Sequence, residues 1–274
     1  MSRNNSQSFR DFEWEGWQKV AGLYHDSFAG VTVQCIANLL DAANVLKGKR
    51  VLDLACGPGY AAAAAASRGA DVLGIDFSPQ MVAEARTRHR DVSFQEGDAE
   101  SLALDAASFD AVIMNFGMLH LEHPDRAMRE VFRILRPGGL FAFTVWDIPQ
   151  RTAGFGVVLS AIQKHGDINV SIPAGPPFFR FSDLEEAARE LTPVGFTDIR
   201  SIVVPQTWRL ATADRLFEIM MNASVRNAAL LHAQRPEVLA AILNEIRSGL
   251  ETFRTAAGFE LPMPAILTSA RRVA

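Results

Sequence analysis

Apolar strands that alternate with amphipathic helices are the feature that most constrains this fold. Between residues 50 and 147, short apolar segments bounded by turn residues predict strands, and segments with helical spacing of apolar residues predict helices. The predicted strands cover residues 50–56, 70–77, 92–98, 109–117 and 140–146. The predicted helices cover residues 60–69, 78–90 and 124–135. Such units build a doubly wound, mostly parallel α/β sheet with helices on both faces.

The flanking segments are less regular. Helical spacing predicts helices before the first strand, over residues 11–45. Ser182, with Glu185 three residues later, predicts a capping box that starts a helix. The remaining predicted elements are a long loop over 149–181 with a helix near 154–165, a helix over 182–195, a sixth strand over 196–210, helices over 212–257 and a final strand over 259–273. Prolines in the final strand predict an edge position or an irregular start.

Composition excludes several classes of protein. Apolar residues make up 49% of the 274 residues, and the net charge is −4 without any basic block, so we expect no nucleic-acid partner. Cys35 and Cys56 form neither a disulfide framework nor a CxxC zinc motif, so no metal site is predicted. The polar start MSRNNSQSFR and the lack of an 18-residue apolar run predict a cytoplasmic protein without a signal peptide or a membrane span.

Acidic residues gather where the predicted strands end. Asp53 lies just before the glycine loop of residues 55–59, Asp76 ends the second strand and Asp98 ends the third. Ligands of such sheets bind at the carboxyl ends of the strands. No lysine or arginine lies in that loop or at these strand ends, so the site favours hydroxyls, amines and positive charge over a pyrophosphate. Asp76 follows Asp53 by 23 positions (76 − 53), close to the spacing of about 20 at which an acid meets a ribose diol.

Five motifs carry a family resemblance. VLDLACGPG, GIDFS, EGDAE, FDAVIMNFGMLHL and ILRPGG resemble, in order and spacing, the motifs of class I S-adenosylmethionine-dependent methyltransferases. The type 11 subgroup, which includes the ubiquinone and menaquinone C-methyltransferases, is the most similar. The resemblance covers residues 45–147 and implies a Rossmann-like fold with a seven-stranded sheet and a helical lid or insertion. It also implies S-adenosyl-L-methionine as the cofactor, S-adenosyl-L-homocysteine as the product and an enzyme of class EC 2.1.1.

The resemblance also implies where the cofactor lies. The loop of residues 55–59 passes under the methionine moiety, although Ala55 stands where the family often has glycine. Asp76 holds the ribose hydroxyls, Phe77 lies along the adenine, and Asp98 accepts from the adenine amino group beside the Ala99 amide. The full set of predicted cofactor-binding residues is Tyr24, Asp53, Ala55, Cys56, Gly57, Gly59, Asp76, Phe77, Met81, Asp98, Ala99, Asn115 and Phe116.

Two groups of residues have alternative interpretations. His120 is the candidate catalytic base, or else a residue that starts a helix and packs beside the cofactor. An aromatic set either packs in the core or lines an apolar acceptor pocket, and Met220 and Met221 have the same two interpretations. The aromatic set is Trp146, Phe178, Phe179, Phe181 and Trp208.

These observations predict a methyltransferase that acts on a small, apolar or aromatic acceptor. Two alternatives remain: an NAD(P)-binding oxidoreductase, because residues 57–62 fit G-x-G-x-x-A, and a non-catalytic S-adenosylmethionine-binding protein. Both a monomer and a homodimer are open. The predicted regions are 1–46, N-terminal helices and a candidate lid; 47–150, the cofactor-binding core; 151–205, the rest of the core with a loop; 206–257, a helical insertion and candidate acceptor lid; and 258–274, the closing strand.

Overall fold

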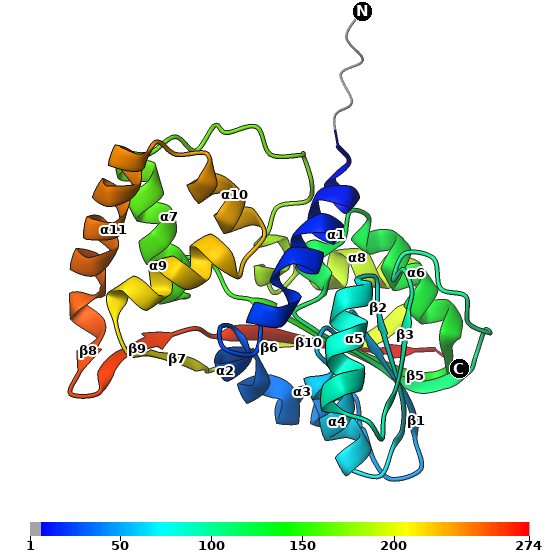
Figure 1. The fold of residues 1–274 in the computed structure, drawn as a ribbon. Helices are drawn as coiled ribbons and strands as arrows, with labels where there is room; N and C mark the ends of the chain where they lie inside the picture. The colour runs from blue at the N-terminus through cyan, green and yellow to red at the C-terminus, as the bar shows by residue number, and fades with distance from the viewer. Residues whose placement is uncertain (1–6, 274) are drawn as a thin grey trace, which may run out of the picture.

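The computed structural model describes residues 7–273, and the outermost ends of the regions predicted over 1–46 and 258–274 lie outside them (Figure 1). A seven-stranded sheet in the order β3-β2-β1-β4-β5-β10-β6 forms the centre. Only β10 runs antiparallel to its neighbours. The strands are β1 Arg50–Leu54, β2 Asp71–Asp76, β3 Ser93–Glu96, β4 Phe109–Asn115, β5 Leu135–Trp146, β6 Phe196–Val204 and β10 Ala265–Arg272. The predicted doubly wound fold is confirmed.

Helices pack on this sheet because their apolar faces need cover. The helix α4 is almost entirely alanine, a strong helix former whose small side chain allows close packing on the sheet. The helix α5 begins as predicted, because the Ser78 hydroxyl accepts from the Met81 amide and Pro79 occupies the first turn. The helices that cover the sheet are α3 Ile36–Ala42, α4 Tyr60–Ser67, α5 Pro79–Arg88, α6 Pro124–Ile134 and α8 Glu186–Val194.

Two predicted strands are each broken in two, so those predictions are corrected. The segment predicted over 196–210 forms β6 and β7, and the segment over 259–273 forms β9 and β10. The breaks coincide with Pro205 and Pro264, since proline has no amide for the ladder. The irregular start predicted for the final strand is present, but β10 is an interior strand between β5 and β6. A small second sheet, in the order β7-β9-β8, comprises β7 Thr207–Leu210, β8 Arg254–Thr255 and β9 Gly258–Pro262.

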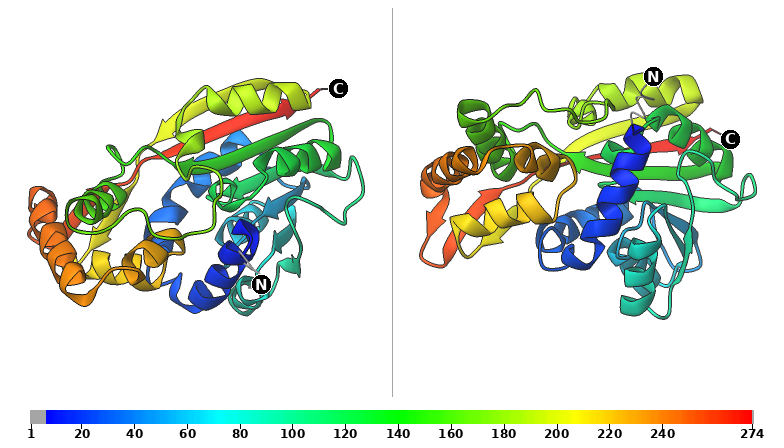
Figure 2. Two further views of the ribbon diagram at one scale, coloured as in Figure 1. Left: turned by 90° about the horizontal axis from the view of Figure 1, so that it is seen from above. Right: turned by 45° about the horizontal axis from the view of Figure 1, so that its top comes forward.

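Four helices of the second half, which cover residues 153–165, 213–222, 226–232 and 236–250, gather beside this small sheet, and α1 lies between them and the core helices (Figures 1 and 2). Helix α11 packs against both α7 and α9. The helices are α1 Phe9–Val20, α2 Ala29–Thr32, α7 Ala153–His165, α9 Ala213–Asn222, α10 Arg226–His232 and α11 Pro236–Leu250, and short 3₁₀ turns cover Ala21–Leu23, Val33–Cys35, Met118–His120, Arg180–Ser182 and Glu251–Phe253. Within residues 7–273, none of these helices has the length and apolar character needed to cross a bilayer.

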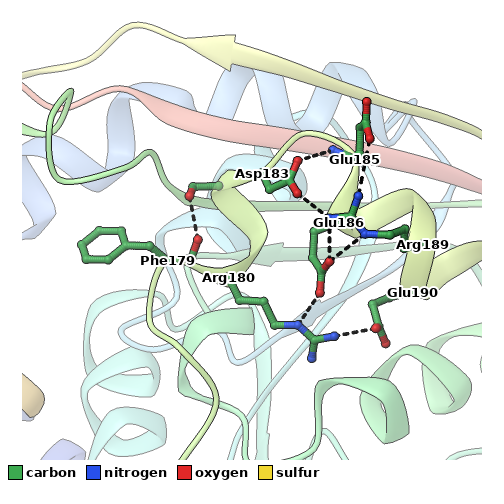
Figure 3. Close-up of polar contacts among 8 residues, drawn as sticks. Phe179, Arg180, Asp183, Glu185, Glu186, Arg189 and Glu190 are labelled. Carbon is green, nitrogen blue, oxygen red and sulfur yellow. Dashed lines mark hydrogen bonds and ion pairs between the residues drawn. The ribbon is translucent and has the colours of Figure 1, made fainter.

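The predicted capping box at Ser182 is wrong. The Ser182 hydroxyl donates to the Phe179 carbonyl, and α8 starts at Glu186. Ion pairs hold this turn in place: Arg180 contacts Glu186 and Glu190 of α8, as Figure 3 shows. The end of the long loop is therefore fixed to α8 by charge pairs, and the Ser182 hydroxyl does not cap that helix.

Candidate functional site

A cavity opens where the parallel strands end, as expected for this kind of sheet. It holds about 1320 Å³ of empty space, including its open mouth. Its floor comes from the loops after β1, β2, β3 and β4, and its cover comes from α1 and from the start of α10. The predicted site residues that line it are Tyr24, Ala55, Cys56, Gly57, Asp76, Phe77, Met81, Asp98, Ala99, Asn115, Phe116 and His120. Asp53 and Gly59 are not among its lining residues.

Asp76 links the glycine loop to the end of β2. Its side chain is 6% exposed, and its two oxygens accept from the Gly57 amide at 2.8 Å and the Ser78 amide at 2.9 Å. Burial raises its pKa to about 6, although these two amides partly offset that effect. A carboxylate has about four acceptor positions, so Asp76 retains capacity for two hydroxyl donors from a ligand.

Asp53 lies beneath the loop and supports it. One of its oxygens accepts from the Ala62 amide at 2.8 Å, at the start of α4, whereas the other is buried without a partner among the described residues. Burial raises the pKa of Asp53 to about 8, so the neutral acid predominates at pH 7. In this arrangement Asp53 connects β1 to α4, and a direct role at the cofactor stays a prediction.

The glycine loop is left-handed at three positions. Ala55, Gly57 and Gly59 have φ values of 54°, 51° and 83°, so the strain expected for alanine at the first position is present. A Cβ atom on Gly59 would lie 2.6 Å from the ring of buried Phe94. A Cβ on Gly57 would meet nothing within 4 Å. The two glycines are therefore required for different reasons.

Alanine substitutions should separate these reasons. We expect Gly59→Ala to lower the free energy of unfolding by about 2–4 kcal/mol, because backbone strain and a clash with the Phe94 ring add together. Gly57→Ala carries the strain alone and should cost about 1–2 kcal/mol. Urea denaturation monitored by circular dichroism measures both. Equal losses for the two variants would contradict the packing role of Gly59.

Helix α1 covers the mouth of the cavity through polar contacts to two of the loops. Arg10 donates to Asp98 from two nitrogens, at 2.9 and 3.1 Å. The Trp14 indole donates to the Phe77 carbonyl at 3.1 Å. No local pattern predicts this role of Arg10, because it lies 88 positions from its partner in the sequence. Of the three acids at the strand ends, Asp98 is therefore paired with a cation from a distant element.

The other end of the cavity is aromatic. The rings of Phe116 and Trp146 stack with centroids 4.1 Å apart, and Phe155 packs edge-on against both Trp146 and Phe178. Phe155 could not be predicted from the sequence, because it belongs to no motif. Of the predicted aromatic set, Trp146 and Phe178 line this cavity, and Phe179 lines a neighbouring one. The remaining predicted pocket residues, Phe181, Trp208, Met220 and Met221, line neither cavity.

Comparison with known proteins agrees with this geometry. Residues 52–143 match a family model described as a methyltransferase domain. A demethylmenaquinone methyltransferase from Renibacterium salmoninarum is 30% identical over 170 residues, which cover 59% of this chain and 72% of the relative. The chain belongs to the class I S-adenosylmethionine-dependent methyltransferases, in the type 11 subgroup. The cofactor of this methyltransferase is S-adenosylmethionine.

Other relatives align with a smaller part of this chain. A demethylmenaquinone methyltransferase from Beutenbergia cavernae is 41% identical over 110 residues, 40% of this chain and 46% of the relative. A malonyl-[acyl-carrier protein] O-methyltransferase from Enterobacter lignolyticus is 39% identical over 95 residues, 35% of this chain and 38% of the relative. The chain thus aligns with less than half of these two relatives.

Solved structures support the fold. Haemonchus contortus phosphoethanolamine N-methyltransferase 2, in complex with S-adenosyl-L-methionine, superposes with a TM-score of 0.58 and 22% identity, covering 98% of this chain and 61% of that one. The [4+2]-cyclase SpnF superposes with a TM-score of 0.53 and 22% identity, covering 88% of this chain and 81% of that one. Because the cyclase shares the fold, the fold alone determines neither the acceptor nor the reaction.

The residues present fit S-adenosylmethionine. Asp76 retains acceptor positions for a diol, and Phe77 and Met81 offer apolar surfaces beside it in the cavity wall. Asp98 and Ala99 follow on the next loop, where an amine and a ring nitrogen would find an acceptor and an amide. Lysine and arginine are absent from the glycine loop, so a cationic ligand meets no repulsion there.

Proposed function

We propose that this methyltransferase acts on a small, apolar or aromatic acceptor bound at the aromatic end of the cavity. The division of the cavity into a nucleoside end, around Asp76, and an aromatic end, around Phe116, Trp146 and Phe178, carries the proposal. When bound, the cofactor supplies a sulfonium methyl group that a nucleophile takes by in-line displacement. Such a reaction depends on alignment and on exclusion of water more than on a strong acid.

In this proposal the nucleoside end of the cavity binds and orients the cofactor. Asp76 accepts from the ribose hydroxyls, and its bond to the Gly57 amide holds the glycine loop in register with them. The Asn115 side chain is already committed, because it accepts from Thr144 at 2.7 Å and donates to the Thr32 carbonyl at 3.1 Å. Asn115 therefore acts in the proposal by fixing the backbone around Phe116, the residue that turns from the sheet toward the aromatic end.

The aromatic end excludes water and selects apolar molecules. A second cavity adjoins it and shares Phe155, Phe178, Arg226 and Asn227 with it. Eleven of the thirteen residues that line this second cavity are apolar, and most come from the loop of residues 172–179 and from α7. Room for an apolar substituent beside the aromatic walls supports an acceptor with a hydrophobic body.

Calorimetry and a turnover panel test the proposal. We expect S-adenosylmethionine to bind at micromolar concentration, with NAD as a control that gives no heat. Turnover is then measured as release of S-adenosylhomocysteine with naphthoquinols, phenols, carboxylic acids and amines, of which the quinols come first because of the relatives' names. Binding of NAD in preference to S-adenosylmethionine would contradict the nucleoside end. Turnover confined to charged, polar acceptors would contradict the aromatic end.

A further inference from the structure

A buried carboxylate stands behind His120. Glu13, on α1, has no exposed surface, and its two oxygens accept from three side chains. The His120 Nδ1 atom lies 2.9 Å from Oε2, which also accepts from the Trp17 indole at 3.1 Å, and the Arg226 Nε atom lies 2.8 Å from Oε1. Four elements, α1, α10 and the turns that carry His120 and Pro176, meet here, because Arg226 also donates to the Pro176 and Leu119 carbonyls.

Glu13 is ionised in this setting. Burial alone would raise its pKa, but the charges and hydrogen bonds of His120 and Arg226 outweigh burial and hold the pKa below its ordinary value. An ionised carboxylate only accepts hydrogen bonds, so the Nδ1 atom of His120 must carry the proton between them. In a neutral imidazole, the Nε2 atom is then left as the acceptor.

The His120 ring borders the cavity, and one of its nitrogens has no partner among residues 7–273. This nitrogen is Nε2, and it is not among the buried unpartnered atoms. The Trp17 ring packs edge-on against the imidazole with centroids 4.7 Å apart, and Phe178 packs edge-on at 6.1 Å. The ring is therefore held by a carboxylate on one nitrogen and by aromatic contacts on its sides, with the other nitrogen open.

From this geometry we infer that Glu13 and His120 form a carboxylate–histidine dyad that deprotonates an acceptor carrying an aromatic hydroxyl. The inference rests on the proposed function and names its acceptor class. The acceptor O–H bond breaks, the proton goes to Nε2, and the electron pair freed on the phenolate forms the bond to the methyl carbon while the carbon–sulfur pair stays on sulfur. Glu13 is a positioning residue: it fixes the tautomer of His120 and stabilises the imidazolium that results.

The aromatic side chains of the cavity wall are the reason why we infer an acceptor with an aromatic hydroxyl. Phe178 and Trp146 favour a flat ring beside His120, and a phenol is acidic enough for an imidazole to deprotonate as it reacts. The other charged groups that line the cavity are Arg10, Asp76, Asp98, Glu100, Glu122 and Arg226. Asp98 is already paired with Arg10, and the two arginines stay protonated and cannot accept the acceptor proton.

Nitrogen-15 NMR of histidine-labelled protein tests the dyad without any acceptor. Two-bond proton–nitrogen spectra, with the His120 signals assigned by their loss in His120→Gln, should show the Nδ1–H tautomer in the wild type. In Glu13→Gln we expect that preference to be lost. Glu15→Gln, on the exposed face of the same helix, is the matched control and should leave the tautomer preference unchanged. An Nε2–H tautomer in the wild type would overturn the inference, whether or not Glu13→Gln folds.

Steady-state kinetics give the second readout. They are measured with whichever naphthoquinol or phenol of the turnover panel the enzyme methylates. Glu13→Gln should lower kcat about 10- to 100-fold, with KM and the affinity for S-adenosylmethionine unchanged, and Glu13→Asp should restore part of the loss. Unchanged kcat in both Glu13→Gln and His120→Gln would overturn the dyad while leaving the methyltransferase assignment intact. Failure of the wild type to bind S-adenosylmethionine would instead overturn the proposed function. The His120 tautomer seen by NMR would still show whether the Glu13–His120 dyad exists.

Discussion

Asp76→Asn should weaken S-adenosylmethionine binding at least about 100-fold. The substitution keeps the shape of the side chain but removes the charge and replaces one acceptor with a donor. Hydrogen bonds to a charged group are each worth about 1.5–3 kcal/mol, so the loss of one bond to ribose and the weakening of the other account for a change of this size. Isothermal titration calorimetry measures the affinity, and Asp76→Ala, which also removes the support of the Gly57 amide, should bind no cofactor.

The same carboxylate predicts a pH dependence. Its pKa is raised to about 6 by burial, and cofactor binding favours the ionised form. The affinity of the wild type should therefore fall about tenfold as the pH drops from 7 to 5, because Asp76 becomes protonated over that range. Asp76→Asn should show no such step near pH 6, which separates this group from others that titrate in the cavity.

A matched control lies at the other end of the same strand. Asp71 begins β2, its side chain is 80% exposed, and its nearest cation, Arg50, is 4.0 Å away. Asp71→Asn should leave the affinity for S-adenosylmethionine unchanged. If Asp76→Asn binds as tightly as Asp71→Asn, then the acid at the end of β2 does not hold the ribose, and the placement of the nucleoside is wrong.

The sequence predicts best what depends on neighbouring residues. The strands up to Trp146, apart from the first five residues of β5, follow from periodicity and turn chemistry within a few residues, as do the Ser78 cap and the position of Asp76. The same local signals predict that the loops after β1, β2 and β3 lie together at one edge of the sheet, because parallel strands end on the same side. Asp53 shows the limit of this reasoning, since the residues before a glycine loop do not reveal whether a carboxylate faces a ligand or a helix end.

The rest of the site depends on contacts between distant segments. Glu13 and His120 are 107 positions apart, and Glu13 and Arg226 are 213 apart, so no spacing rule connects them. The split of the last strands has a similar cause. The 196–210 and 259–273 segments look continuous in sequence, but their paired bends near Pro205 and Pro264 send one half of each into a different sheet.

Arg226→Met tests how much these distant contacts contribute to stability. Glu13 has no exposed surface, and removal of its guanidinium partner leaves a buried charge with only neutral donors and His120. We expect the free energy of unfolding to fall by about 3 kcal/mol at pH 7, measured by urea denaturation. The pKa of Glu13 is lowered in the folded protein, so its stabilising contribution is present above the ordinary carboxyl range and is lost as the pH falls. The loss in Arg226→Met should therefore shrink toward pH 4.

Arg189→Met is the matched control, because this arginine also contacts several carboxylates but lies at the surface (Figure 3). Its side chain is 51% exposed, compared with 16% for Arg226, so water replaces its partners at little cost. Arg189→Met should leave the unfolding transition within the error of the measurement. Equal small losses in both variants would mean that Glu13 is not held as a buried carboxylate, and the tautomer inferred for His120 would lose its cause. A large loss confined to Arg226→Met would link the stability of the cavity cover to the charge that orients the base.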